Sequence, residues 1–308
     1  MVSSALSSTP AQTDSQVPCA LPQALQLAQR LPEIMLEASR IAQSVAAGAH
    51  QRKQAGQGEN FWQYRPFSSG EPAQRIDWRR SARDNHLYVR EQEWQTSQHI
   101  WIWPDLSPSM QFRSSNTLPS KAERATVLML ALAEVLAKAG EQVGLPDAPL
   151  RPRRLDAAAQ LAHALAARAQ HHPLPSALPE KRRASLLICS DFLGDTATLA
   201  TCLAKASAKG ISGHLIQILD PAEETFPFTG ATRFIDPTTR QSLTGEKAQE
   251  WQTAYCNRLA AHKHQLQALA VQHGFSYTCL HTDTPASSGA LAIHAALSGH
   301  AAQADRRA

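Results

Sequence analysis

The sequence predicts an α/β fold, built on a mostly parallel β-sheet with helices on both faces. Three short apolar runs, "IWIW", "SLLIC" and "HLIQIL", lack the polar alternation of a strand that has one face in solvent. Segments with helical periodicity separate these runs, and several of them end in glycine. Strands and helices that alternate in this way favour parallel pairing, with both faces of the sheet covered.

The composition favours a globular protein rather than a nucleic-acid or membrane protein. The chain has 308 residues, 43% of them hydrophobic, which suits one large domain or one domain with an appendage. Its net charge of +4 does not require a nucleic acid partner. Its five cysteines form no CxxC pair, which is typical of reduced thiols in a cytosolic protein.

No targeting or membrane segment is expected. The N-terminus lacks the basic and apolar regions of a signal peptide. The longest apolar run, residues 125–137, is shorter than the roughly 20 residues that a membrane span needs. These features predict a soluble, cytoplasmic protein.

Changes of composition divide the chain into four parts. Residues 1–20 are rich in Ser, Thr, Gln and Pro, and we expect them to be disordered. Residues 21–96 should hold an N-terminal helix and a Trp/Arg-rich segment, residues 97–300 the α/β domain, and residues 301–308 a tail. The helix is predicted from apolar residues at helical spacing: Ile34, Met35, Ala38, Ile41, Ala42 and Val45.

The Trp/Arg-rich segment, residues 59–94, differs in composition from the rest of the chain. It predicts short strands or a hairpin, with "HLYVREQEW" as a strand and a short helix near "AQRIDWRRSA". Because it carries so many aromatic residues, we expect it to pack against the α/β domain.

The α/β domain is predicted element by element from residue 99 onward. The helix at residues 120–140 has the clearest signals, with a capping box from Ser120 to Glu123 and a stop at Gly140. Further helices are predicted over residues 155–170, 196–210, 246–274 and 287–297. Strands are predicted over residues 99–103, 141–145, 184–192, 212–220 and 275–283.

Short oxygen-bearing side chains follow two of the apolar strands. Asp105, Ser107 and Ser109 come at alternate positions after "IWIW", and Asp191 comes directly after "SLLICS". Since the carboxyl ends of parallel strands share one edge, both aspartates should lie on the same rim. Two crowded carboxylates repel each other unless a cation lies between them, and such oxygens suit a hard divalent cation. The alternative is that these are ordinary turn and N-cap residues.

Two motifs carry a family resemblance. "PDLSPSM" resembles the metal-ion-dependent adhesion site of von Willebrand factor A domains, whose pattern is DxSxSM after the first strand. The preceding segment resembles the signature of the bacterial family called domain of unknown function 58, and the likeness covers roughly residues 50–300. The matching positions are Arg65, Gly70, Glu71, Arg75, Ile76, Asp77, Trp78, Ser81, Ala82, Arg83, Leu87, Tyr88, Val89, Arg90 and Glu91.

The resemblance implies a von Willebrand factor A-like fold, preceded by a small appendage of one helix and a β-hairpin. It also implies a divalent cation, Mg²⁺ in the first instance, held by Asp105, Ser107, Ser109 and Asp191. A complete adhesion site has a further threonine, but "GLPDAPLRPRRLD" contains neither Thr nor Ser. The candidate replacements are Asp147 and Asp156, and Asp195 competes with Asp191 as the second aspartate.

The signature segment has two interpretations of its own. Arg75, Asp77, Trp78, Arg79 and Arg83 include residue types that are enriched in binding hot spots, so they predict a partner-binding face. The structural alternative is that Asp77 pairs with a nearby arginine. In that case Trp62, Tyr64, Trp78 and Tyr88 would form a small aromatic cluster.

The resemblance also limits the function. Members of the family are often encoded beside MoxR-type AAA+ ATPases, which implies a role in the assembly or maturation of other proteins. The expected function is therefore a non-enzymatic protein-interaction module with a partial adhesion site and a protein partner, such as that ATPase.

Two alternatives to the interaction module stay open. One is a metal-free scaffold of the same fold. The other is a magnesium-dependent phosphoryl hydrolase. The haloacid-dehalogenase type needs a second aspartate where Ser107 stands, and the chain has no HExxH, GxSxG or GxxxxGK[ST] motif.

Overall fold

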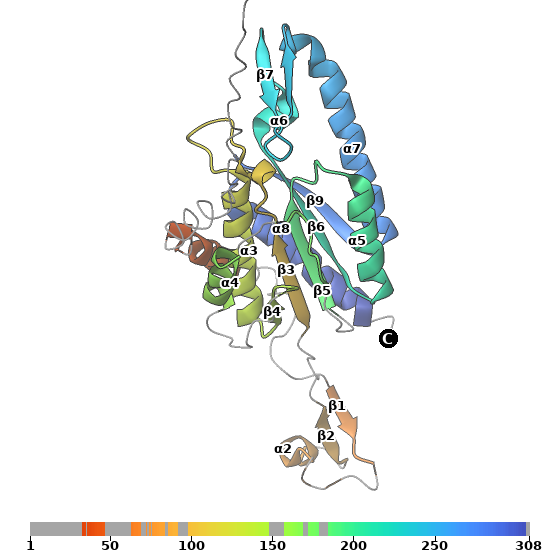
Figure 1. The fold of residues 1–308 in the computed structure, drawn as a ribbon. Coiled ribbons are helices and arrows are strands. Elements are labelled where there is room, and N and C mark those ends of the chain that lie inside the picture. The colour runs from red at the N-terminus through yellow and green to blue at the C-terminus, as the bar shows by residue number, and fades with distance from the viewer. Residues whose placement is uncertain are drawn as a thin grey trace, which may run out of the picture.

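The centre of the molecule is a five-stranded sheet in which every strand pair is parallel (Figure 1). The computed structural model describes residues 33–34, 36–46, 63–68, 72, 74, 76–83, 86–91, 98–147, 157–168, 172–178 and 184–305. In spatial order the strands are β4 (Gln142–Gly144), β3 (His99–Pro104), β5 (Ala184–Ser190), β6 (Ser212–Leu219) and β9 (Phe275–His281). The predicted α/β class and its three central strands are confirmed.

Helices cover both faces of this sheet, which explains why the strands lack polar alternation. Ile100 and Ile102 of β3 pack into the core on the side of α3, α4 and α8, whereas Trp101 and Trp103 pack on the side of α5 and α7. The helices are α3 (Lys121–Lys138), α4 (Ala157–Ala166), α5 (Thr196–Ala208), α7 (Gln252–Gln272) and α8 (Ala286–Asp305). Among the described residues, none of the helices has the length and apolar character needed to cross a membrane.

Helix α3 begins and ends where the sequence predicts. Ser120 and Glu123 form the expected capping box, and Gly140 follows the helix with a φ of +95°, a conformation that glycine adopts without strain. Nearly the whole helix is buried, because it lies between the sheet and other helices. The start of α3 is therefore a fixed point beside the rim of the sheet.

The N-terminal part contains the expected helix and strand pair. Residues 36–46 are helical, and Ala38, Ile41 and Val45 join the core beside α3. Strand β1 (Gln63–Pro66) pairs antiparallel with β2 (Tyr88–Glu91), and the short helix α2 (Trp78–Ser81) lies between them in the chain.

The arrangement differs from the prediction at both ends of the chain. Figure 1 shows β1, α2 and β2 beyond the end of the sheet rather than packed against the α/β domain, so the predicted packing is wrong. Helix α8 extends to Asp305, into the segment predicted as a tail. The predicted disorder of residues 1–20 lies outside the described residues, as does Met35.

Three elements that the sequence did not predict follow β6. They are the short helix α6 (Pro221–Thr225) and the antiparallel strands β7 (Thr232–Ile235) and β8 (Ser242–Gly245). Figure 1 shows this hairpin beside α6 and the beginning of α7. Its base is held by an aromatic cluster, with ring centroids 4.7 to 6.2 Å apart. The cluster consists of Phe226, Phe228, Phe234, Trp251 and Tyr255.

Candidate functional site

The two predicted aspartates lie on the same rim of the sheet, at the ends of neighbouring strands. Pro104 of β3 is paired with Cys189 of β5, and the backbone N–H of Asp105 donates to the Cys189 carbonyl at 2.8 Å. Asp105 therefore lies beside Ser190, directly before Asp191. The parallel register brings together residues that are far apart in the chain.

Asp105 is fully buried and is held by two donors. Its Oδ1 accepts the backbone N–H of Ser107 at 2.8 Å, and its Oδ2 accepts the hydroxyl of Ser190 at 2.6 Å. Burial raises the pKa of the Asp105 carboxyl, against the lowering effect of these hydrogen bonds. The hydrogen bond from the Ser107 N–H is a local turn interaction, which the alternative of ordinary turn residues predicts.

The two serines of the motif lie side by side. Their hydroxyl oxygens are 3.2 Å apart, close enough for one to donate to the other. Ser107 precedes a short 3₁₀ helix, η2 (Pro108–Gln111), in which Ser109 is half-buried and Met110 is fully buried in the core. The buried methionine anchors the loop, which fixes both hydroxyls relative to Asp105.

Asp191 is paired with a lysine that the sequence analysis missed. The ammonium of Lys121 donates to Asp191 Oδ2 at 2.9 Å and to Glu223 Oε1 at 2.6 Å, and its side chain is only 1% exposed. Burial alone would lower the pKa of Lys121, but the charges of Asp191 and Glu223 outweigh it and raise the pKa. The lysine is therefore a permanent positive charge at the rim.

Glu223 is oriented by a third aspartate at a strand end. Asp220 follows β6 and forms a capping box with Glu223, whose Oε2 accepts the backbone N–H of Asp220 at 2.9 Å. Asp220 Oδ2 also accepts the backbone N–H of Ser114 at 2.9 Å. These contacts tie α6 to the loop between β3 and α3. Burial raises the pKa of Glu223 despite the nearby Lys121.

The donor set fits a divalent cation poorly. Both oxygens of Asp105 accept protein hydrogen bonds, and those of Asp191 accept from Lys121 and, at 3.2 Å, from the Leu193 N–H. A second cation at Asp191 would meet the Lys121 ammonium, and two unit charges 4 Å apart repel by about 4 kcal/mol at an effective dielectric constant near 20. The other two predicted ligands, the hydroxyls of Ser107 and Ser109, contact each other and are not paired with Lys121.

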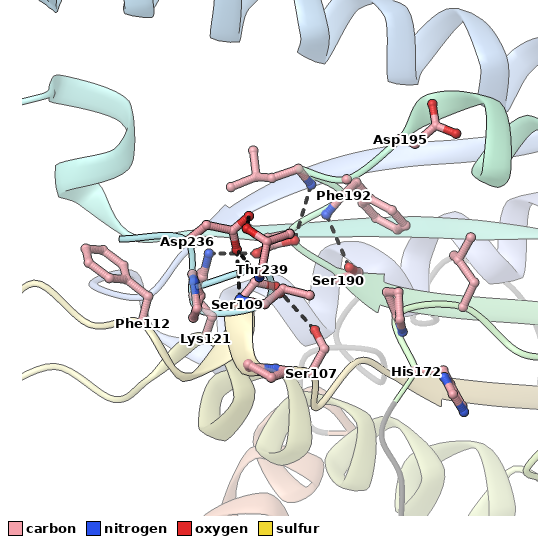
Figure 2. Close-up of a pocket in the computed structure, with 18 of the residues that line it drawn as sticks. Ser107, Ser109, Phe112, Lys121, His172, Ser190, Phe192, Asp195, Asp236 and Thr239 are labelled. Atoms are coloured by element: carbon pink, nitrogen blue, oxygen red, sulfur yellow. Dashed lines mark hydrogen bonds and ion pairs between the residues drawn. The ribbon is translucent and has the colours of Figure 1, made fainter. Parts of the chain in front are cut away.

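The other predicted acidic ligands have different roles or lie elsewhere. Asp147 forms an ion pair with Arg168, whose guanidinium lies 4.2 Å from the ring centroid of Trp103. Asp195 caps α5 by accepting the backbone N–H groups of Ala197 and Thr198, and Figure 2 shows it apart from Ser107 and Ser109. Asp156 lies outside the described residues.

A pocket of about 990 Å³ opens over the rim (Figure 2). The residues that line it include Ser107, Ser109 and Lys121 and, from the turn after β7, residues 236–239. Three of the exposed large apolar side chains among the described residues also line it. They are Phe112, Leu193 and Ile235. The pocket therefore combines hydroxyl groups with apolar surface.

The signature segment is placed apart from this pocket. Asp77 caps α2 by accepting the Arg80 N–H at 3.0 Å, while Arg79 and Arg83 are exposed. Trp78 is 62% exposed and Tyr88 is half-buried, and both the aromatic cluster and the partner-binding face stay predictions. Arg75, the remaining predicted contact, lies outside the described residues, as does Trp62.

The parallel sheet, with helices on both of its faces, defines an α/β domain. The family model "Protein of unknown function DUF58" matches residues 63–265, which is more than half of the chain. The chain belongs to the DUF58 family, as the sequence resemblance predicts.

Two solved structures are similar to part of the chain. One is the conserved hypothetical protein BatB from Bacteroides thetaiotaomicron, with 14% identity, 66% of this chain and 100% of that chain covered, and a TM-score of 0.37. The other is an aerotolerance-related membrane protein from Bacteroides fragilis, with 18% identity, coverages of 64% and 97%, and a TM-score of 0.34. No curated protein matches the chain. These weak likenesses assign no role to the rim.

Proposed function

We propose that the protein is a non-enzymatic interaction module that receives a segment of a partner protein in the rim pocket. The observation that carries this proposal is the exposure of Phe112, Leu193 and Ile235 around one cavity of about 990 Å³. Apolar side chains that are exposed together, beside groups that can form hydrogen bonds, are typical of docking sites. A monomeric surface without a partner rarely gathers them in one hollow.

The walls of the pocket are fixed, as binding to a preformed surface requires. Ser107 and Ser109 are anchored through Asp105 and the buried Met110. The hairpin of β7 and β8, whose turn also lines the pocket, is anchored by Phe234, whose ring centroid lies 5.5 Å from that of Phe226. A rigid pocket lowers the entropy cost of binding a partner segment.

The rim groups that resemble catalytic machinery are already engaged. Both oxygens of Asp105 accept hydrogen bonds inside the protein, and the Lys121 ammonium is paired with two carboxylates. A phosphoryl hydrolase needs a strand-end carboxylate that is free to attack or to hold the ion. The engagement of Asp105 supports the binding function over the hydrolase alternative.

The proposed partner is a MoxR-type AAA+ ATPase, in keeping with the family resemblance, and the proposed role is in the assembly or maturation of other proteins in the cytoplasm. Trp78, Arg79 and Arg83 would provide a second contact, because an exposed tryptophan beside arginines is typical of a binding hot spot.

Exchange of one exposed apolar residue for a charge tests the pocket. Ile235→Asp should weaken binding of the purified ATPase at least tenfold, or about 1.4 kcal/mol, because it places a charge in an apolar contact. Val271→Asp is the matched control, since Val271 is 71% exposed on α7 and does not line the pocket. Isothermal titration calorimetry measures both, and equal affinity in the two variants would contradict the proposal.

A further inference from the structure

We infer that the ammonium of Lys121 supplies the positive charge that a divalent cation supplies in a complete adhesion site, so that this rim works without a metal ion. The inference deepens the proposed function. It rests on the proposed function only where partner binding is concerned. The ion pairs of Lys121 with Asp191 and Glu223 exist without a partner.

The Lys121 ammonium lies between the end of β5 and helix α6, which follows β6. It contacts Asp191, directly after β5, at 2.9 Å and Glu223, in α6 after β6, at 2.6 Å. The sequence predicts a cation at the crowded rim beside Asp191, and the Lys121 ammonium supplies a positive charge there, between Asp191 and Glu223 rather than between Asp191 and Asp105. One lysine therefore satisfies a charge requirement that otherwise favours an ion from solution.

Lys121 is fixed from both ends and cannot easily make room for an ion. Its backbone N–H donates to the Phe112 carbonyl at 3.3 Å, immediately after the capping box of Ser120. Its ammonium also lies 5.8 Å from the ring centroid of Phe112. The long side chain runs through a closed environment, because it is only 1% exposed.

Glu223, the α6 residue that accepts a hydrogen bond from Lys121, is also held in place. Glu223 takes part in the capping box of α6, so its second oxygen accepts the Asp220 N–H at 2.9 Å while the first accepts from Lys121. Movement of Lys121 away from the rim would leave the buried Asp191 and the half-buried Glu223 without their shared cation. A metal ion would have to overcome that cost before it could bind.

Metal titration of the whole wild-type chain tests the inference without a partner. We expect calorimetry with Mg²⁺ and with Mn²⁺ to show no saturable binding at millimolar concentration. The melting temperature should also be the same with magnesium and with chelator. Saturable binding that Ser107→Ala or Ser109→Ala abolishes would overturn the inference.

A neutral residue at the lysine position provides the reverse test. Lys121→Met keeps the length of the side chain but leaves Asp191 and Glu223 without their cation. The variant should therefore acquire Mg²⁺ or Mn²⁺ binding and a melting temperature that rises with the ion. Lys138→Met, which removes an exposed lysine of the same helix, should show neither effect. A folded Lys121→Met variant that binds neither Mg²⁺ nor Mn²⁺ would overturn the inference. If the variant does not fold, the titration of the wild-type protein decides alone.

The partner experiment separates this inference from the proposed function. ATPase binding by the wild-type protein should have the same affinity with magnesium and with chelator, in a nucleotide-free assay. A binding that needs the metal would overturn the inference and leave the interaction module in place. No ATPase binding under either condition would contradict the proposed partner, and the titrations above would still decide the role of Lys121.

Discussion

The ammonium of Lys121 donates a hydrogen bond of 2.9 Å to the carboxylate of Asp191 and so joins the start of α3 to the end of β5. The two residues are 70 positions apart in the chain, and both are buried. A buried ion pair costs free energy to desolvate, but removal of one member costs more, because the other charge is left without a partner. The rim is therefore sensitive to single substitutions at this pair.

Loss of the lysine should destabilise the protein strongly. We expect Lys121→Met to lower the free energy of unfolding by about 3–5 kcal/mol, because Asp191 and Glu223 lose their cation. Lys138→Met should change it by less than about 0.5 kcal/mol, since the Lys138–Glu134 pair is a solvent-exposed contact one helical turn apart. Urea denaturation measures both, and equal losses would show that the buried pair contributes no more than a surface pair.

Asp105 should have a structural role as well as its place at the rim. Asp105→Ala leaves the Ser190 hydroxyl and the Ser107 N–H without their acceptor, which should cost about 1–3 kcal/mol. Ser109→Ala is the control, because Ser109 is half-buried and its hydroxyl contacts that of Ser107 at 3.2 Å, where either hydroxyl could donate. Thermal melts compare the two variants. An Asp105→Ala protein as stable as the wild type would mean that relief of the repulsion from Asp191 offsets the lost hydrogen bonds.

Glu224 should make stability depend on pH in the acid range. Burial alone would raise the pKa of this carboxyl, but hydrogen bonds and charges from Lys263 and His281 outweigh it and lower the pKa. A lowered folded-state pKa means that the stabilisation is present above the unfolded value of 4.5 and is lost as the pH falls through the folded value.

The matching variant is Glu224→Gln. Because Glu224 is more than a third exposed, we expect the difference in unfolding free energy from the wild type to be about 1 kcal/mol or less at neutral pH. The difference should shrink as the pH falls below 4.5, which denaturant titrations at several pH values would show. A difference that grows toward acid pH would contradict the sign of the shift.

The hairpin beside the pocket should loosen when its aromatic anchor is removed. Phe234 packs against Phe226, Phe228 and Trp251, so Phe234→Ala should weaken the hairpin by about 1–3 kcal/mol. Its cross-strand partner Leu243 is exposed, and Leu243→Ala should have little effect. Hydrogen exchange of the backbone amides of residues 232–245 reports this local opening. Equal exchange in the two variants would show that the aromatic contacts do not hold the hairpin.

The parts that could be predicted from the sequence depend on local signals. The capping box at Ser120 marks the start of α3, and Gly140 marks its end just after Lys138. The apolar runs of β3, β5 and β6 mark strands that are buried on both faces. The shared rim of Asp105 and Asp191 follows directly from parallel pairing.

The parts that could not be predicted depend on tertiary contacts. Lys121 follows a capping serine and looks like an ordinary first-turn residue, and only the fold brings Asp191 and Glu223 to its ammonium. Strands β7 and β8 are four residues each and mostly exposed, so their apolar pattern is weak. They are held by Phe226 and Trp251, which lie outside both strands. The pocket wall that they form was missed for this reason.

The exposed tryptophan of the signature segment should contribute to binding and not to folding. Trp78 is 62% exposed, so Trp78→Ala should change the free energy of unfolding by less than about 0.5 kcal/mol. If the segment is a second contact with the ATPase, the same substitution should weaken binding by about 2 kcal/mol or more, as expected for a hot-spot tryptophan. Leu87→Ala is the control, since Leu87 is 44% exposed and lies next to β2 in the same segment. Calorimetry and urea denaturation on both variants separate the two effects: a loss of stability without a loss of affinity would assign Trp78 to the small β1–α2–β2 unit and leave the rim pocket as the proposed docking site.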